Sequence, residues 1–113
     1  IEEGKRLFKA IGEPNVMIKV PATHAGYAAM KELLSMGISV NATLIFSPEQ
    51  ARRCLKAMTA GLHAYEAIGG GKVNAVISVF VSRFDRLLDA DFAAEGMDVA
   101  KTGIYNAAKI YTM

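Results

Sequence analysis

The chain has 113 residues, which is enough for one modest domain with a hydrophobic core. Hydrophobic residues make up 52% of it and charged residues 21%, a composition that excludes a disordered chain. The formal net charge of +2 is too small to indicate a nucleic-acid partner or an anionic membrane surface, and no apolar run is long enough to predict a membrane span.

The first twelve residues predict a helix, because acidic residues stand in its first turn and apolar residues recur at helical spacing. Gly12 is a fitting end for this helix, and Pro14 begins a turn. Residues 16–23 then predict a short buried strand, a run of apolar and β-branched side chains stopped by a proline. The candidate apolar face of the helix consists of Ile1, Leu7, Phe8 and Ile11.

A second helix and a second strand follow. Thr23 can cap a helix that ends at Gly37. Residues 38–46 then predict a strand, because they are mostly apolar and β-branched.

Ser47 and Gln50 have the spacing of a capping box, with Pro48 at the first helical position. We therefore expect a third helix from this point to about Ala67, where the glycines at 69–71 interrupt it.

Residues 73–81 predict a third strand, residues 86–94 a helix, and residues 98–111 another helix after a break at Gly96. Strands that alternate with amphipathic helices predict parallel βαβ units, and therefore an α/β fold. Two architectures fit at this point: a doubly wound sheet, or a piece of a β/α barrel.

Lys19 stands in the middle of the first predicted strand. A lysine is almost never fully buried unless it is paired or functional, because taking an ammonium out of water is costly. Desolvation also makes a lysine lose its proton more readily, and a neutral lysine is a nucleophile that can form a Schiff base with a carbonyl substrate. The alternative is a structural Lys19 that reaches solvent at a strand end or pairs with a carboxylate.

Each predicted strand carries a polar group inside an apolar run. Ser39, Asn41 and Thr43 share one face of the second strand, because side chains alternate, and Ile45 follows them on that face. Ser78 stands among apolar residues in the third strand. In a β/α barrel, polar groups on neighbouring strands together form a site near the strand ends.

Arg83 follows the third strand, where an arginine can bind a phosphate through two hydrogen bonds. The alternative is an ordinary surface ion pair with Asp85.

We expect no metal site, because His24 and His63 are far apart and have no ligand spacing around them. The single cysteine, Cys54, cannot form an internal disulfide, which fits a reducing cytoplasm. Without a histidine partner, we expect it to be packed rather than reactive.

Three segments, in order, carry a family resemblance. Residues 18–23 are Ile-Lys-Val-Pro-Ala-Thr, residues 40–47 are Val-Asn-Ala-Thr-Leu-Ile-Phe-Ser, and residues 77–85 are Ile-Ser-Val-Phe-Val-Ser-Arg-Phe-Asp. At these spacings the chain resembles the fourth, fifth and sixth strands of the transaldolases. Residues 103–111 resemble the helix that follows the sixth strand.

The resemblance implies a partial (β/α)8 TIM barrel, with about three parallel strands and flanking helices, of which residues 1–113 form the central portion. It also implies a cytoplasmic enzyme of the pentose phosphate pathway, which transfers a dihydroxyacetone unit between sugar phosphates through a lysine Schiff base. Its substrates would be sedoheptulose 7-phosphate and glyceraldehyde 3-phosphate, and its products erythrose 4-phosphate and fructose 6-phosphate. It implies no metal or organic cofactor and no nucleic-acid or membrane partner, and it leaves the oligomeric state open.

Five residues match functional positions of that family. Lys19 matches the Schiff-base lysine, and Thr43 matches the threonine that helps to hold the catalytic water. Asn41 matches the asparagine that hydrogen-bonds the dihydroxyacetone unit. Ser78 matches the serine that contacts substrate hydroxyls, and Arg83 matches an arginine that binds phosphate. A neutral, hydroxyl-rich wall would keep the lysine partly unprotonated.

The chain also departs from the family. Where many transaldolases have Ser-Pro-Phe-Val-Gly-Arg, residues 78–83 are Ser-Val-Phe-Val-Ser-Arg, which is closer to the longer Val-Ser-Arg type. A complete barrel needs about 250 residues. The acidic residues of the family's first and third strands, and a further arginine of its seventh, have no counterpart here, so we expect this segment to be inactive alone. Two rival functions remain: an aldolase that cleaves the ketose phosphate outright, and a non-catalytic α/β domain.

Overall fold

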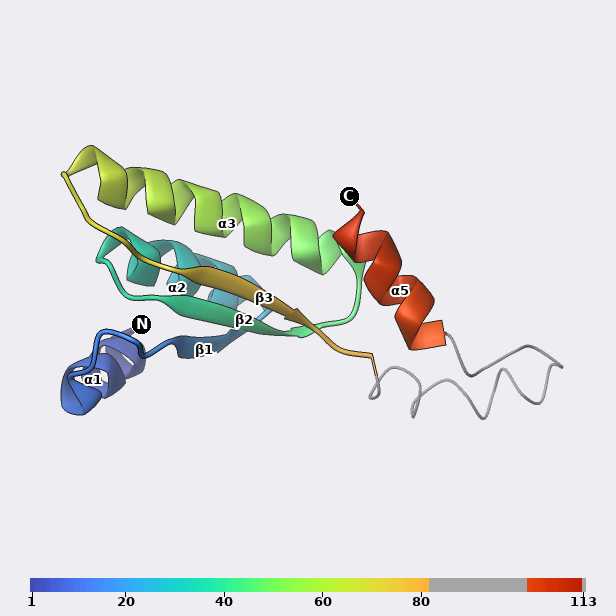
Figure 1. The fold of residues 1–113 in the computed structure, drawn as a ribbon, viewed down its shortest axis with the longest axis horizontal. Helices are drawn as coiled ribbons and strands as arrows, with labels where there is room; N and C mark the ends of the chain where they lie inside the picture. The colour runs from blue at the N-terminus through green and yellow to red at the C-terminus, as the bar shows by residue number, and fades with distance from the viewer. Residues whose placement is uncertain (82–101, 113) are drawn as a thin grey trace, which may run out of the picture.

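The computed structural model describes residues 1–81 and 102–112 (Figure 1). The described elements are, in chain order, α1 (Glu2–Ile11), β1 (Ile18–Pro21), α2 (His24–Ser35), β2 (Val40–Ile45), α3 (Pro48–Ala67), β3 (Ala75–Val79) and α5 (Thr102–Tyr111). This alternation of strands and helices confirms the α/β class. The predictions for residues 86–94 and for Gly96 lie outside the described residues.

The three strands form one parallel sheet in the order β1-β2-β3. Lys19 of β1 pairs with Asn41 of β2, and Asn41 pairs in turn with Val76 of β3. The helix α2 connects the first two strands and α3 connects the second and third, since parallel neighbours need such a crossover. Three parallel strands with flanking helices are the predicted arrangement of a partial (β/α)8 barrel.

The helices α2 and α3 cover the same face of the sheet, and the hydrophobic core lies between the two layers (Figure 1). The buried residues of β1 and β2 alternate with exposed or half-buried ones, as expected of strands with only one covered face. The largest fully buried side chains are those of Met30, Leu33, Leu34, Val40, Ile45 and Cys54.

Two glycines set how closely the helices approach their neighbours. A Cβ atom on Gly61 of α3 would lie 2.5 Å from the carbonyl oxygen of Lys31 and 2.8 Å from Cβ of Leu34, so α2 and α3 pack backbone to backbone there. A Cβ on Gly4 of α1 would lie 3.2 Å from the side chain of Leu33. Glycine is therefore needed for the α2–α3 contact in particular.

The helix α1 contributes less to the core than its sequence predicts. Phe8 packs against the core, and Gly4 is buried. The predicted four-residue apolar face is therefore packed only at Phe8, and the described residues leave its other three members exposed. Those three exposed side chains are Ile1, Leu7 and Ile11.

The predicted helix ends are largely confirmed. The Oγ1 of Thr23 accepts a hydrogen bond from the backbone N–H of Gly26 at 3.1 Å, and Gly37, which has a φ of 78°, follows α2. The Oγ of Ser47 accepts from the N–H of Gln50 at 3.2 Å, and α3 ends at Ala67. The strands begin at Ile18, Val40 and Ala75, each two residues later than predicted, because the residues before them lie in loops.

None of the helices described within residues 1–81 and 102–112 is both long enough and apolar enough to cross a membrane.

Candidate active site on the uncovered face of the sheet

The predicted site residues lie on the sheet face opposite α2 and α3. Lys19 is exposed, whereas its strand neighbours are buried beneath the helices. Asn41 and Thr43 are half-buried and alternate with buried residues of β2. Because side chains alternate across a strand and Lys19 pairs with Asn41, these three residues share one face.

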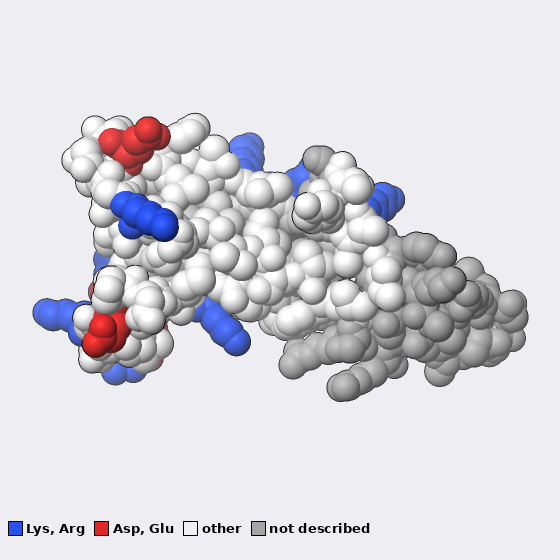
Figure 2. Space-filling model, viewed as in Figure 1, with Lys and Arg blue, Asp and Glu red and all other residues white. Residues whose placement is uncertain are grey.

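Lys19 is the only charged residue on the three described strands. Its expected burial is not found, because the described residues leave this face of the sheet uncovered. Within the described residues no ion pair includes Lys19. In Figure 2 the visible acidic side chains lie at one end of the molecule, whereas Lys and Arg side chains project at several points along it. On the described strands the neighbours of Lys19 are therefore neutral, and Glu3 of α1 lines the same surface pocket as Lys19.

A hydrogen bond joins two of the predicted site residues. The hydroxyl of Ser78 on β3 donates to Oδ1 of Asn41 on β2, at 2.8 Å. With Oδ1 accepting, the amide nitrogen of Asn41 is left to donate, and the oxygen of Ser78 can still accept. The pair thus offers one donor and one acceptor beside Lys19, which suits a substrate rich in hydroxyl and carbonyl oxygens.

A bulge ends this polar face after Thr43. Ala42 pairs with Ile77 and Ile45 with Val79, so three steps along β2 match two steps along β3. The extra residue is Leu44, whose φ of 59° is left-handed and unusual for a side chain with a Cβ.

The bulge corrects one prediction. Strict alternation would place Ile45 on the polar face, but the extra residue turns Ile45 into the core, where it is fully buried. Ser39 also has a structural partner, since its buried Oγ accepts from the backbone N–H of Asn74 at 3.0 Å.

Gln50 has a different role from the one its sequence position predicts. In a capping box its side chain would accept from the N–H of Ser47. Instead, its Oε1 accepts from the N–H of Phe46 at 2.9 Å. Its Nε2 donates to the carbonyl oxygens of Ala22 and Leu44, both at 3.2 Å. A glutamine three residues after a helix cap is the only sequence signal for this contact.

The side-chain amide of Asn106, like that of Gln50, binds the loop that follows β2. The Nδ2 of Asn106 on α5 donates to the carbonyl oxygen of Phe46 at 2.7 Å. The ring of Phe46 meets that of Phe80 edge to face, with centroids 5.5 Å apart. The loop after β2 is therefore held by α3, α5 and the residue that follows β3.

The remaining predicted groups lie apart from this face. Arg83 lies outside the described residues. Cys54 is buried in α3, and burial raises the pKa of its thiol to about 11, as expected of a packed cysteine. His24 begins α2 and His63 lies on α3. Residues 1–81 and 102–112 contain no group of three His, Cys, Asp or Glu side chains that could hold a metal ion.

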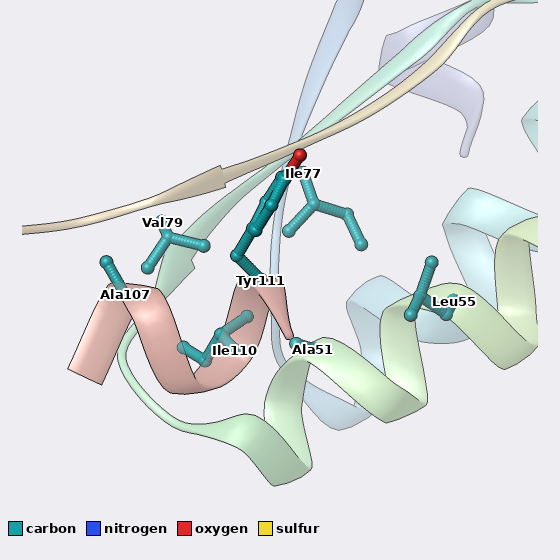
Figure 3. A pocket seen from close by; sticks show the side chains of 7 residues that line it. All are labelled: Ala51, Leu55, Ile77, Val79, Ala107, Ile110 and Tyr111. Carbon is teal, nitrogen blue, oxygen red and sulfur yellow. The ribbon is translucent and has the colours of Figure 1, made fainter. Parts of the chain in front are cut away.

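An apolar pocket of about 420 Å³ lies between α3, β3 and α5 (Figure 3). It opens on the helix-covered side of β3 and contains none of the predicted site residues. Its chemistry is that of a packing gap rather than of a catalytic site. The residues that line it are Ala51, Leu55, Ile77, Val79, Ala107, Ile110 and Tyr111.

Comparison with known proteins identifies the family. Residues 1–113 match the family model described as transaldolase/fructose-6-phosphate aldolase. The chain is 50% identical to a transaldolase of Campylobacter jejuni subsp. doylei, over 96% of this chain and 34% of the relative. It is 48% identical to a transaldolase of Helicobacter pylori, over 98% and 32%, and 43% identical to transaldolase 1 of Streptomyces avermitilis, over 98% and 31%.

The chain thus spans about a third of the length of these curated relatives. Since the family match covers every residue of it, the chain belongs to the transaldolase/fructose-6-phosphate aldolase family.

Proposed function

We propose that the protein containing this segment is a transaldolase, which transfers a dihydroxyacetone unit between sugar phosphates through a Schiff base on Lys19. The observation that carries the proposal is the placement of Lys19. It is the only charged residue of the described strands and pairs with Asn41, which in turn accepts a hydrogen bond from Ser78. The names of three relatives support the same reaction.

In the proposed reaction, neutral Nζ of Lys19 adds to the ketose carbonyl, and the carbonyl oxygen leaves as water to give an iminium. A carbon–carbon bond then breaks. Its electron pair stays on the three-carbon unit as an enamine, and an aldose phosphate departs after its hydroxyl loses a proton. The enamine attacks the aldehyde of a second aldose phosphate, whose oxygen gains a proton. Water then hydrolyses the new iminium and frees Lys19.

The polar side chains would each bind a different part of the substrate or the catalytic water. Among the described residues, the amide nitrogen of Asn41 can still donate and the hydroxyl oxygen of Ser78 can still accept, which suits the oxygens of the three-carbon unit. Thr43 would help to hold the catalytic water, and Arg83 would bind a substrate phosphate. The sequence has no counterpart of the family's acidic residues, so the proton carrier would come from elsewhere in the parent protein.

The segment itself would be the central portion of a (β/α)8 barrel, contributing its fourth, fifth and sixth strands. Two features support this placement: the three described strands are parallel, and the helices described within residues 1–81 and 102–112 leave the other face of the sheet uncovered. In such a barrel the uncovered face would be the interior, and Lys19 would be enclosed there. We also propose a cytoplasmic location, which suits the unpaired Cys54, and sugar phosphates as the ligands.

The test is borohydride trapping of the full parent protein with a ketose phosphate donor, followed by peptide mass mapping. We expect a reduced three-carbon adduct on Lys19 and none on Lys31, an exposed lysine of α2 that serves as the internal control. A folded protein that binds the donor but forms no adduct on Lys19 would overturn the proposal.

The second candidate is an aldolase that cleaves the ketose phosphate without passing the unit on. The family description, which includes fructose-6-phosphate aldolase, is the observation that favours it. In both reactions borohydride would reduce a three-carbon adduct on Lys19. Product analysis with and without an acceptor aldose phosphate separates them, because only the transferase needs the acceptor for turnover.

A non-catalytic α/β domain makes the opposite prediction for Lys19. In that case Lys19→Met would leave activity unchanged, and because Lys19 is exposed the stability of the fold would change little. Loss of the adduct and of activity in a normally folded Lys19→Met protein would exclude it.

A further inference from the structure

Gln50 spans both strands that carry the proposed catalytic residues. Its amide nitrogen donates to Ala22, the residue directly after β1, and to Leu44, the residue directly after Thr43. Both N–H groups of the amide are therefore used, one for each strand. Ala22 lies three residues after Lys19, so one side chain of α3 reaches the end of each strand.

The carbonyl of Leu44 needs this donor because of the bulge. Leu44 has the left-handed φ of 59° and is the extra residue opposite β3. A carbonyl at a bulge is taken out of the regular strand ladder. A leucine in this conformation persists only where its surroundings hold it, and Gln50 supplies a hydrogen bond at that carbonyl.

The two strands are also joined directly at this level. The N–H of Ala22 donates to the carbonyl oxygen of Thr43 at 2.9 Å. The backbone of Thr43 is thus bonded to Ala22 on one side, and its neighbour Leu44 is bonded to Gln50 on the other. A shift of the bulge would turn the side chain of Thr43 away from the face that holds Lys19.

We propose that Gln50 is a positioning residue. Its two donated hydrogen bonds fix the spacing of the β1 and β2 ends and the bulge at Leu44, and so aim Thr43 at the face shared by Lys19 and Asn41. This inference rests on the proposed function, because Gln50 would act in the same reaction only by positioning Thr43. Gln50 would not touch the substrate.

The decisive variant is Gln50→Glu in the full parent protein. A glutamate keeps the oxygen that accepts from Phe46 and nearly the same volume, but as a carboxylate it has no N–H to donate. The matched control is Glu49→Gln, the reverse exchange at the adjacent, exposed position of α3, where the partners are Arg52 and Arg53.

We expect kcat of Gln50→Glu to fall by about 10- to 100-fold, because small misplacements of reacting groups have effects of this size. The KM for the donor should stay within about twofold, since substrate contacts are unchanged. Glu49→Gln should keep both constants within about twofold. A kcat of Gln50→Glu equal to that of the unmodified protein would overturn the inference.

Amide hydrogen exchange separates positioning from a general loss of stability. In Gln50→Glu the N–H of Ala22 should exchange at least about tenfold faster, whereas the N–H of Phe46 should keep its protection because its acceptor remains. Equal acceleration of both amides, or of neither, would contradict the proposal. In the unmodified protein the Ala22 amide should exchange as slowly as interior strand amides, which tests the inference even if the variant fails to fold.

These readouts keep the two hypotheses apart. If the unmodified protein forms no adduct on Lys19, the proposed function fails, and the exchange pattern still decides whether Gln50 fixes the strand ends. If the adduct forms but Gln50→Glu turns over normally, only the role of Gln50 fails.

Discussion

Within the single strand β2, Val40, Ala42 and Ile45 are fully buried against α2 and α3, whereas Asn41 and Thr43 on the opposite face are half-buried and polar. The buried face is apolar because its side chains fill the space between the sheet and two helices. The other face carries hydrogen-bonding groups and, on β1, a lysine. Alternation along the strand therefore separates the packed face from the face of the proposed site. Substitutions on one face should change one property and largely leave the other intact.

The sharpest test of this separation is Lys19→Arg. Arginine keeps the positive charge but cannot form the proposed Schiff base, so we expect activity of the full protein to fall by about a thousandfold or more. Because the charge is kept and Lys19 is not part of the hydrophobic core, the free energy of unfolding should change by no more than about 1 kcal/mol. Steady-state assays and urea unfolding measure both effects, and Lys31→Arg on α2 is the control. Retention of more than a tenth of the activity would contradict the separation.

On the helix-covered side, the matched pair Gly61→Ala and Gly71→Ala should give opposite results. Alanine ordinarily favours a helix over glycine by about 1 kcal/mol. At Gly61, however, the added Cβ would meet the carbonyl oxygen of Lys31 at 2.5 Å. We expect a net destabilisation of about 1–3 kcal/mol there, from the forced separation of α2 and α3. At Gly71 a Cβ would meet nothing within 4 Å, so the change should be neutral or stabilising by at most about 1 kcal/mol.

Urea unfolding of the two variants checks this prediction, together with their specific activity measured without urea. The specific activity of folded Gly61→Ala should match that of the unmodified protein, because Gly61 lies on the helices and not on the site face. Equal stability of both glycine variants would show that α2 and α3 are less tightly packed than the structure describes.

The elements of this fold could be predicted because their signals are local. Thr23 and Ser47 cap their helices through hydroxyls three residues before the N–H groups that they bind, and Gly37 follows α2 in a left-handed turn. The parallel order of the strands followed from the alternation of strands and helices. Each of these features depends on residues close together in the chain.

The features that could not be predicted depend on contacts far apart in the chain. The side chain of Gln50 reaches Ala22, 28 residues earlier, and this contact competes with the local capping box. No glycine marks the bulge at Leu44, so a period of two predicts that Ile45 lies on the polar face. Likewise, the burial of Lys19 depends on what covers the other face of the sheet, which a strand pattern cannot supply.

A smaller effect on the site face is expected from Ser78→Ala. This change removes the hydrogen bond to Oδ1 of Asn41 and leaves that amide free to rotate. We expect kcat/KM to fall by about 3- to 10-fold, the value of one net hydrogen bond. Ser35→Ala on α2, whose hydroxyl bonds to the Glu32 carbonyl, is the control and should leave kcat/KM unchanged. A loss as large as that of Lys19→Arg would instead mean that Ser78 takes part in the chemistry.

The smallest expected effect is at Cys54, which is buried in α3. With its pKa raised to about 11, about one thiol in a thousand is ionised at pH 8, whereas about a quarter would be ionised at the ordinary value near 8.5. Alkylation of Cys54 by iodoacetamide, followed by peptide mapping, should therefore be at least about a hundredfold slower in the folded protein than in urea.

The same shift has a consequence for stability with a definite sign. Because the folded pKa lies above the unfolded one, burial of the neutral thiol contributes stability that is present in full below about pH 8.5 and is lost as the pH rises through about 11. Urea unfolding between pH 8 and 10.5 should thus show a steeper loss of stability in the unmodified protein than in Cys54→Ala, which has no thiol to ionise. Parallel curves for the two proteins would place the thiolate in contact with water, and would mean that the covered face of the sheet is more open at α3 than its packing indicates.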